Sequence, residues 1–138
     1  MHEVGRLSPE FTGAQRRRDV EHNVGVRRSR LLARFGFRHG FAERTGGVSA
    51  PPFDTLNLGL DLGDSDAAVS ENRQRFASSL GVAAERLFEQ RQVHGTESRE
   101  VQASDRASEI LGLEGDALLT RVAGVAVAAR TADCVPLL

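Results

Sequence analysis

The sequence contains no lysine, tyrosine or tryptophan, and its one cysteine is Cys134. The absence of lysine excludes Schiff-base enzymes and nucleotide-binding P-loops, because both need a lysine side chain. A single cysteine excludes an internal disulfide framework. No apolar run approaches the roughly 20 residues of a membrane-spanning helix, so we expect no membrane partner.

The rest of the composition is that of a globular domain. The chain has 138 residues, of which 40% are hydrophobic and 27% are charged. These values fit one folded domain with its own core. The net charge is −1, but the basic residues are concentrated at the start, with net +5 over residues 1–44 and net −6 over residues 45–138.

The first thirty residues show no sustained hydrophobic period and carry the arginine clusters Arg16–Arg18 and Arg27–Arg28. We therefore expect a disordered, arginine-rich leader over residues 1–30 and a folded domain over residues 31–138. Acidic residues interrupt the clusters, and no aromatic residues interleave for base stacking, so no nucleic-acid partner is expected. The lack of a signal-peptide apolar stretch and the lone thiol favour a cytoplasmic location.

Local patterns predict a mixture of helices and strands. Phenylalanines alternate with smaller or polar residues over 35–41, which predicts a half-buried strand with His39 on its core face. Leucines alternate over 56–60 and predict a second strand. A helix is expected from about Asp64 to Gly81, with the polar run 71–73 facing solvent. A helical turn is expected over 84–88, and strands over 91–95, 99–102, 117–122 and 125–131.

Two residues are the first candidates for chemistry. Cys134 has three open roles: a buried structural thiol, a nucleophile, or a metal ligand. His94 is the best partner for the last two, as a base or as a second ligand to zinc or copper. The two residues lie forty positions apart, so their spacing selects none of these roles.

The run from Arg44 to Ser49 contains Gly46 and Gly47 and has two readings. Backbone N–H groups beside glycines can form a cradle for an anion, and an arginine can add a charged fork. The same glycines can simply make a turn.

Six segments, taken in order, carry a resemblance to one family. The sequence resembles the laccase-domain proteins, long called multicopper polyphenol oxidoreductases and now read as zinc-dependent purine nucleoside phosphorylases. The resemblance covers about residues 34–138. The segments are His39–Ser49, Leu56–Gly59, Gly63–Asp64, Glu71–Arg73, Gln92–Gly95 and Ala132–Pro136.

The resemblance implies an α+β fold, with mixed β-sheets packed together and helices outside. It also implies a metal site to which this chain contributes His94 and Cys134, both of which would be catalytic. The family's third ligand comes from a later His-Ala-Gly-Trp-Arg segment, which has no counterpart in this sequence. We therefore expect an apparently truncated chain, holding the N-terminal part of the domain and inactive as it stands.

The activity implied is zinc-dependent phosphorolysis of adenosine, inosine, guanosine and methylthioadenosine, together with adenosine deamination. A purine nucleoside and phosphate would be the partners, and no protein partner is implied. From motif position we expect Arg44 to clamp phosphate, with Asn57 and Arg73 making polar contacts to substrate. The alternatives are a copper-dependent polyphenol oxidoreductase, and an inactive truncated product or binding module.

Overall fold

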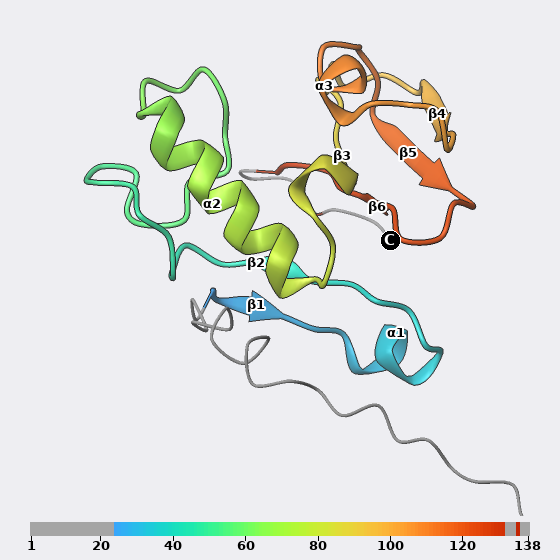
Figure 1. Ribbon diagram of the computed structural model, residues 1–138, viewed down its shortest axis with the longest axis horizontal. Helices are drawn as coiled ribbons and strands as arrows, with labels where there is room; N and C mark the ends of the chain where they lie inside the picture. The colour runs from blue at the N-terminus through green and yellow to red at the C-terminus, as the bar shows by residue number, and fades with distance from the viewer. Residues whose placement is uncertain (1–23, 132–134, 136–138) are drawn as a thin grey trace, which may run out of the picture.

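The computed structural model describes residues 24–131 and residue 135. The fold is α+β, as expected, and Figure 1 shows its arrangement. Within the described part, the strands pair in three two-stranded sheets: β1 with β2 antiparallel, β3 with β6 parallel, and β4 with β5 parallel. The elements are β1 (Val26–Arg27), α1 (Arg30–Arg34), β2 (Phe41–Ala42), α2 (Asp66–Ser79), the 3₁₀ helix η2 (Ala84–Arg86), β3 (Leu87–Phe88), β4 (Ser98–Val101), α3 (Ala107–Ile110), β5 (Ala117–Thr120) and β6 (Ala126–Val127).

The long helix α2 confirms the clearest prediction from the sequence. Ser65 occupies the N-cap position, and the helix ends just before Gly81, whose φ of +70° is the left-handed conformation that favours glycine. Val69 and Phe76 are buried, as the helical period predicts. The expectation that residues 71–73 face solvent is wrong for Asn72, which is 0% exposed.

Two apolar clusters form the core, and β3 lies between them. Successive residues of a strand point to opposite faces. Leu87 therefore packs with Leu56 and Phe76 in the first cluster, whereas Phe88 packs with Val101 in the second. In Figure 1 the C-terminal end of α2 lies next to the β1–β2 pair, while α3, β4 and β5 gather on the opposite side of the molecule.

The strand predicted over residues 35–41 is wrong except at its end. Ser29 caps the short helix α1, and Gly36 follows it with a φ of +79°. This left-handed residue breaks the alternating pattern, so Phe35 and Phe37 are 70% and 64% exposed. Only the last predicted residue, Phe41, enters a strand, where it pairs with Arg27.

The strand predicted over residues 56–60 is also wrong. The backbone there bonds to other groups in place of a neighbouring strand: Leu56 N donates to Arg44 O at 2.7 Å, and Asn57 O accepts from the Asn72 side chain at 2.9 Å. Leu56 is nevertheless buried, as the alternation predicted.

Residues 24–30 fall within the predicted leader, yet they include a short strand and the first residue of α1. Val24 is 8% exposed and belongs to the first apolar cluster, and Val26–Arg27 form β1. The arginine-rich residues 1–23 lie outside the described part of the chain, so the prediction of a disordered leader stays a prediction for them.

Candidate functional site

A broad cleft of about 1570 Å³ runs between the β2 region, the loop that follows it and the β5–β6 region. Arg44 and Asn57 both line it, so the structure brings together two of the residues expected to contact substrate. Arg73 lines a smaller neighbouring cavity. His94 is in the lining of neither.

Arg44 is exposed at this cleft and braces the loop beside it. Its Nε donates to Asp54 O at 3.3 Å and its Nη2 to Pro52 O at 3.2 Å. An arginine has five N–H donors, so further donors remain for a ligand. Its backbone oxygen accepts from Thr55 N and Leu56 N, at 2.8 and 2.7 Å, which fixes where the side chain begins.

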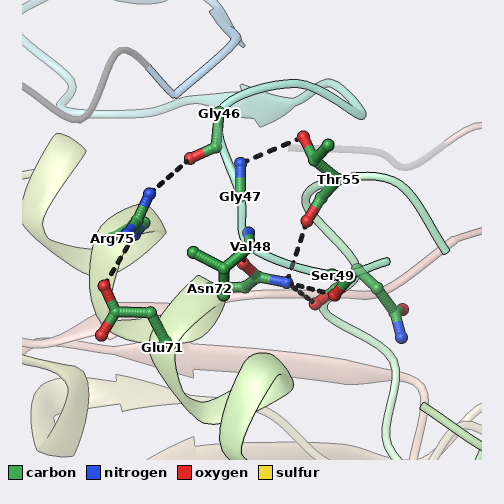
Figure 2. Close-up of polar contacts among 9 residues, drawn as sticks. Gly46, Gly47, Val48, Ser49, Thr55, Glu71, Asn72 and Arg75 are labelled. Carbon is green, nitrogen blue, oxygen red and sulfur yellow. Dashed lines mark hydrogen bonds and ion pairs between the residues drawn. The ribbon is translucent and has the colours of Figure 1, made fainter. Parts of the chain in front are cut away.

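The glycine-rich loop after Arg44 is irregular, and its backbone amides donate to neighbouring protein groups (Figure 2). Gly47 N donates to Thr55 Oγ1 at 3.2 Å, Val48 N to Asn72 Oδ1 at 2.8 Å and Ser49 N to Thr55 O at 2.9 Å. These three amides are therefore committed to protein acceptors. The run is an irregular loop with bends at Arg44 and Gly46, and it does not offer these three amides as an anion cradle.

The same loop requires glycine at position 47. A Cβ atom there would overlap the carbonyl oxygen of Thr55. Helix α2 approaches the loop from the other side, since Arg75 Nη1 donates to Gly46 O at 3.3 Å while its Nε donates to Glu71 Oε1 at 2.7 Å. The loop and the helix therefore form one rigid unit next to the cleft.

Both polar atoms of the Asn57 side chain make hydrogen bonds to protein groups. Its Nδ2 donates to Asp64 Oδ2 at 2.9 Å, and its Oδ1 accepts from Gly59 N at 2.9 Å. Ser49 Oγ donates to the same Asp64 oxygen at 2.6 Å. These hydrogen bonds, that from Ser49 foremost, stabilise the charged carboxylate and lower the pKa of Asp64.

Arg73 takes part in a charge cluster with Glu89 and Arg130, both of which line the cleft. Its Nη1 lies 2.8 Å from Glu89 Oε1 and donates to Leu58 O at 3.4 Å. Glu89 Oε2 lies 2.9 Å from Arg130 Nε, close enough for an ion pair but without the alignment of a hydrogen bond. Glu89 is 5% exposed, so this carboxylate depends on its two arginines.

His94 lies on an exposed loop with an unusual backbone conformation. Its φ is +57°, in the left-handed region, which costs a residue with a side chain about 1–2 kcal/mol. Asp116 offsets this cost, since its carboxylate accepts from His94 N at 2.9 Å and from Gly95 N at 2.7 Å. These hydrogen bonds, that from Gly95 foremost, lower the pKa of Asp116.

The other expected metal ligand, Cys134, lies outside the described residues, so the pairing of His94 with Cys134 stays a prediction. His94 suits a zinc ligand, because its imidazole is exposed and makes no hydrogen bond to any described residue. No group of three His, Cys, Asp or Glu side chains comes together within residues 24–131.

His39, expected on the core face of a strand, is half-buried and bonded at both ring nitrogens. Its Nε2 accepts from Ser29 N at 2.6 Å, and its Nδ1 lies 2.9 Å from Phe37 O.

None of the helices in the described part is both long and apolar enough to cross a membrane.

Sequence reasoning missed the partners that hold the expected site residues in place. Glu89 and Asp116 are ordinary acidic residues in the sequence, and each meets its partners only through the fold. Asp116 is 22 positions from His94 and Glu89 is 16 from Arg73, so no local pattern reports either pairing.

Comparison with known proteins agrees with the motifs. A purine nucleoside phosphorylase of Mycobacterium tuberculosis is 45% identical over 95 residues, covering 69% of this chain and 37% of that protein. Another, of Streptomyces coelicolor, is 45% identical over 105 residues, covering 75% and 42%. The crystal structure of YlmD from Geobacillus stearothermophilus matches with a TM-score of 0.58 at 38% identity, covering 64% of this chain and 34% of that one.

The chain thus spans about two fifths of the length of the curated relatives that it matches. The family described as multi-copper polyphenol oxidoreductase laccase matches residues 38–138, close to the extent predicted from the motifs. The chain therefore belongs to the multi-copper polyphenol oxidoreductase laccase family.

Proposed function

We propose that this chain is part of a purine nucleoside phosphorylase. The observation that carries the proposal is its 45% identity to relatives that bear this name. The cleft supports it, because Arg44 and Asn57 lie together in its lining. Because the chain spans only part of these relatives, we propose the phosphorolytic activity and its substrates for the complete protein. We propose a cytoplasmic location as well.

In the proposed reaction, a phosphate oxygen forms a bond to C1′ of the ribose while the bond from C1′ to the purine nitrogen breaks. The electron pair of the broken bond leaves with the purine, which takes up a proton. Positive charge develops on the ribose in the transition state. The site must therefore hold an anion close to this charge, and bind the sugar and base in a fixed orientation.

Arg44 is the residue we assign to phosphate. It is exposed at the cleft, keeps donors free, and is anchored at its own backbone by the loop 52–56. Arg73 and Asn57 are proposed to make weaker polar contacts. Each is already bonded to protein groups, so each is expected to help shape the site as well as to touch the substrate.

We further propose zinc as the metal, with His94 and Cys134 among its ligands, and adenosine deamination as a second reaction. When bound, zinc supplies a Lewis acid that makes water a better nucleophile near neutral pH. This chain's own part is to present the His94 imidazole from a fixed loop.

The test incubates the 138-residue chain, and beside it the same chain completed with the C-terminal part of the Streptomyces coelicolor relative, with adenosine and inorganic phosphate, and measures adenine and ribose 1-phosphate. The 138-residue chain alone is expected to be inactive and the completed chain active. Formation of both that depends on phosphate supports the proposal. Adenine released at the same rate without phosphate contradicts it. Metal analysis of the same preparation identifies the ion that the chain carries.

The variant Arg44→Ala, made in the completed chain, tests the phosphate assignment. Loss of a charged hydrogen bond worth about 1.5–3 kcal/mol is expected to raise the KM for phosphate about tenfold or more. Deamination uses no phosphate and is expected to stay unchanged. Arg99→Ala, which removes an exposed arginine outside the cleft lining, is the matched control. Equal effects of Arg44→Ala on both reactions would exclude the assignment.

Copper-dependent oxidation of phenols is the second candidate, because the description of the matching family names it. It predicts oxygen consumption with a phenol after loading with copper. An inactive product or binding module predicts neither this oxidation nor phosphorolysis.

A further inference from the structure

We infer that Asp116 is a positioning residue for His94: its carboxylate fixes the loop 93–95 in the conformation that presents the imidazole to a metal ion. This inference rests on the proposed function of His94 as a zinc ligand. It goes further, because it assigns a role to a residue outside every motif that the sequence analysis identified.

The first ground is the set of hydrogen bonds. One carboxylate accepts from three consecutive backbone amides, those of Val93, His94 and Gly95, at 3.2, 2.9 and 2.7 Å to the nearer oxygen. The amides of a tight loop can converge on one acceptor only when the backbone curls around it. The carboxylate therefore selects the curled conformation, including the left-handed φ of His94.

The second ground is that Asp116 is itself rigidly placed. It directly precedes β5, and its own amide donates to Glu97 O at 3.0 Å. On the other side of the loop, Gly115 N donates to Arg91 O at 3.0 Å, and Arg91 N donates to Leu113 O at 2.9 Å. Both ends of the His94 loop are thus hydrogen-bonded to the segment that carries Asp116. The position of the carboxylate relative to the loop is therefore fixed.

The third ground is the state of the imidazole. Every hydrogen bond that Asp116 makes to His94 uses the backbone, and the ring has no hydrogen-bond partner among the described residues. The side chain is exposed and remains available to a ligand. Asp116 therefore restricts the backbone and leaves the ring nitrogens free, which is what a residue that supports a metal ligand must do.

The experiment measures zinc affinity of the 138-residue chain by calorimetric titration, for the wild type and single variants. His94→Ala is expected to abolish binding. Asp116→Ala is expected to weaken it about 10–100-fold, the usual effect of removing a group that orients a ligand. Asp105→Ala is the matched control, because Asp105 also accepts a backbone amide, that of Gln102 at 2.8 Å, but in another turn. It is expected to leave zinc affinity unchanged.

Amide hydrogen exchange gives a readout that does not depend on zinc. Asp116→Ala is expected to speed exchange of the Val93, His94 and Gly95 amides about tenfold or more, with the amides of α2 unchanged. Asp116→Asn keeps one acceptor oxygen and is expected to restore part of the protection. Unchanged exchange in Asp116→Ala would overturn the inference, whatever the zinc result.

The outcomes separate the inference from the proposed function. If His94→Ala abolishes zinc binding and Asp116→Ala binds as tightly as the wild type, the inference fails and the metal ligand stands. If His94→Ala binds zinc as tightly as the wild type, both fail. If the wild type binds no zinc, the proposed zinc ligands fail for this chain, and exchange of the three amides alone decides whether Asp116 fixes the loop. Faster exchange of the three amides when zinc is added would show Asp116 leaving the loop to bind the ion itself, which also overturns its positioning role.

Discussion

Nη1 of Arg73 lies 2.8 Å from Oε1 of Glu89 and joins the middle of α2 to the residue directly after β3. The second carboxylate oxygen of Glu89 lies 2.9 Å from Nε of Arg130, beyond β6. One buried acidic side chain therefore connects three segments that are distant in the sequence. All three border the cleft or the neighbouring cavity.

Replacing Glu89 with alanine is expected to destabilise the chain by about 3 kcal/mol, because it leaves Arg73 and Arg130 without their shared partner. This value is at the lower end for a broken buried pair, since the Arg130 side chain is 31% exposed. Urea unfolding of the 138-residue chain measures the change. Glu71→Ala breaks a pair that is more exposed and is expected to cost less than about 1 kcal/mol. Equal costs for the two variants would contradict a buried role for Glu89.

Asn72→Ala is expected to destabilise the chain by more than about 2 kcal/mol, because several buried partners lose their hydrogen bonds at once. Asn72 Oδ1 accepts from Val48 N, and its Nδ2 lies within 3.2 Å of Ser49 Oγ, Thr55 O and Asn57 O. The free energy of unfolding in urea checks this value. The control is Gln74→Ala, on the exposed side of the same helix. If the two variants cost the same, Asn72 does not hold the loop.

The sequence predicted well where local signals decide the structure. The helix α2 begins at a capping serine and ends at a left-handed glycine, and both signals lie within the helix's own neighbourhood. The sequence also predicted η2, β4 and β5 close to their observed positions. The family and the α+β class followed from motifs that need no tertiary knowledge.

Prediction failed where tertiary contacts override local pattern. Asn72 looks like a solvent-facing helix residue, but the loop 46–49 lies close to the helix. The side-chain amide of Asn72 therefore makes hydrogen bonds to this part of the chain that a neighbouring strand would otherwise make. The leucine alternation at 56–60 correctly predicted the burial of Leu56, but it could not show that the backbone bonds to Arg44 and Asn72. Asp116 carried no signal at all, because its role depends on a contact 22 residues away.

Acid is expected to weaken the loop that contains Asn57 through protonation of Asp64. Hydrogen bonds from Ser49 and Asn57 lower the pKa of Asp64 in the folded state, below the value of about 3.9 in the unfolded chain. The folded chain therefore binds fewer protons between the two values. The stabilisation that these hydrogen bonds give is fully present above the pKa of Asp64 in the unfolded chain. It is lost as the pH falls through the pKa of Asp64 in the folded chain.

The variant Asp64→Asn isolates this contribution. It is expected to be less stable than the wild type at pH 7, with the difference shrinking as the pH falls below about 3.9. Urea midpoints at several pH values measure the difference. Glu85→Gln changes an exposed carboxyl that has no hydrogen-bond partner among the described residues, and its difference from the wild type is expected to stay constant. A constant difference for Asp64→Asn as well would rule out the link.

The second apolar cluster is expected to depend on Phe88, which is 0% exposed and packs with Val101 and Ile110. Phe88→Ala removes most of a buried aromatic side chain and is expected to cost about 3–5 kcal/mol. Because a small domain has only about 5–15 kcal/mol of stability, the milder Phe88→Leu keeps the measurement possible if the alanine variant unfolds. Phe35→Ala, at a side chain that is 70% exposed, is expected to change stability by less than about 0.5 kcal/mol. A cost for Phe35→Ala as large as that for Phe88→Leu would mean that Phe35 is covered in solution and that the core extends beyond the two clusters.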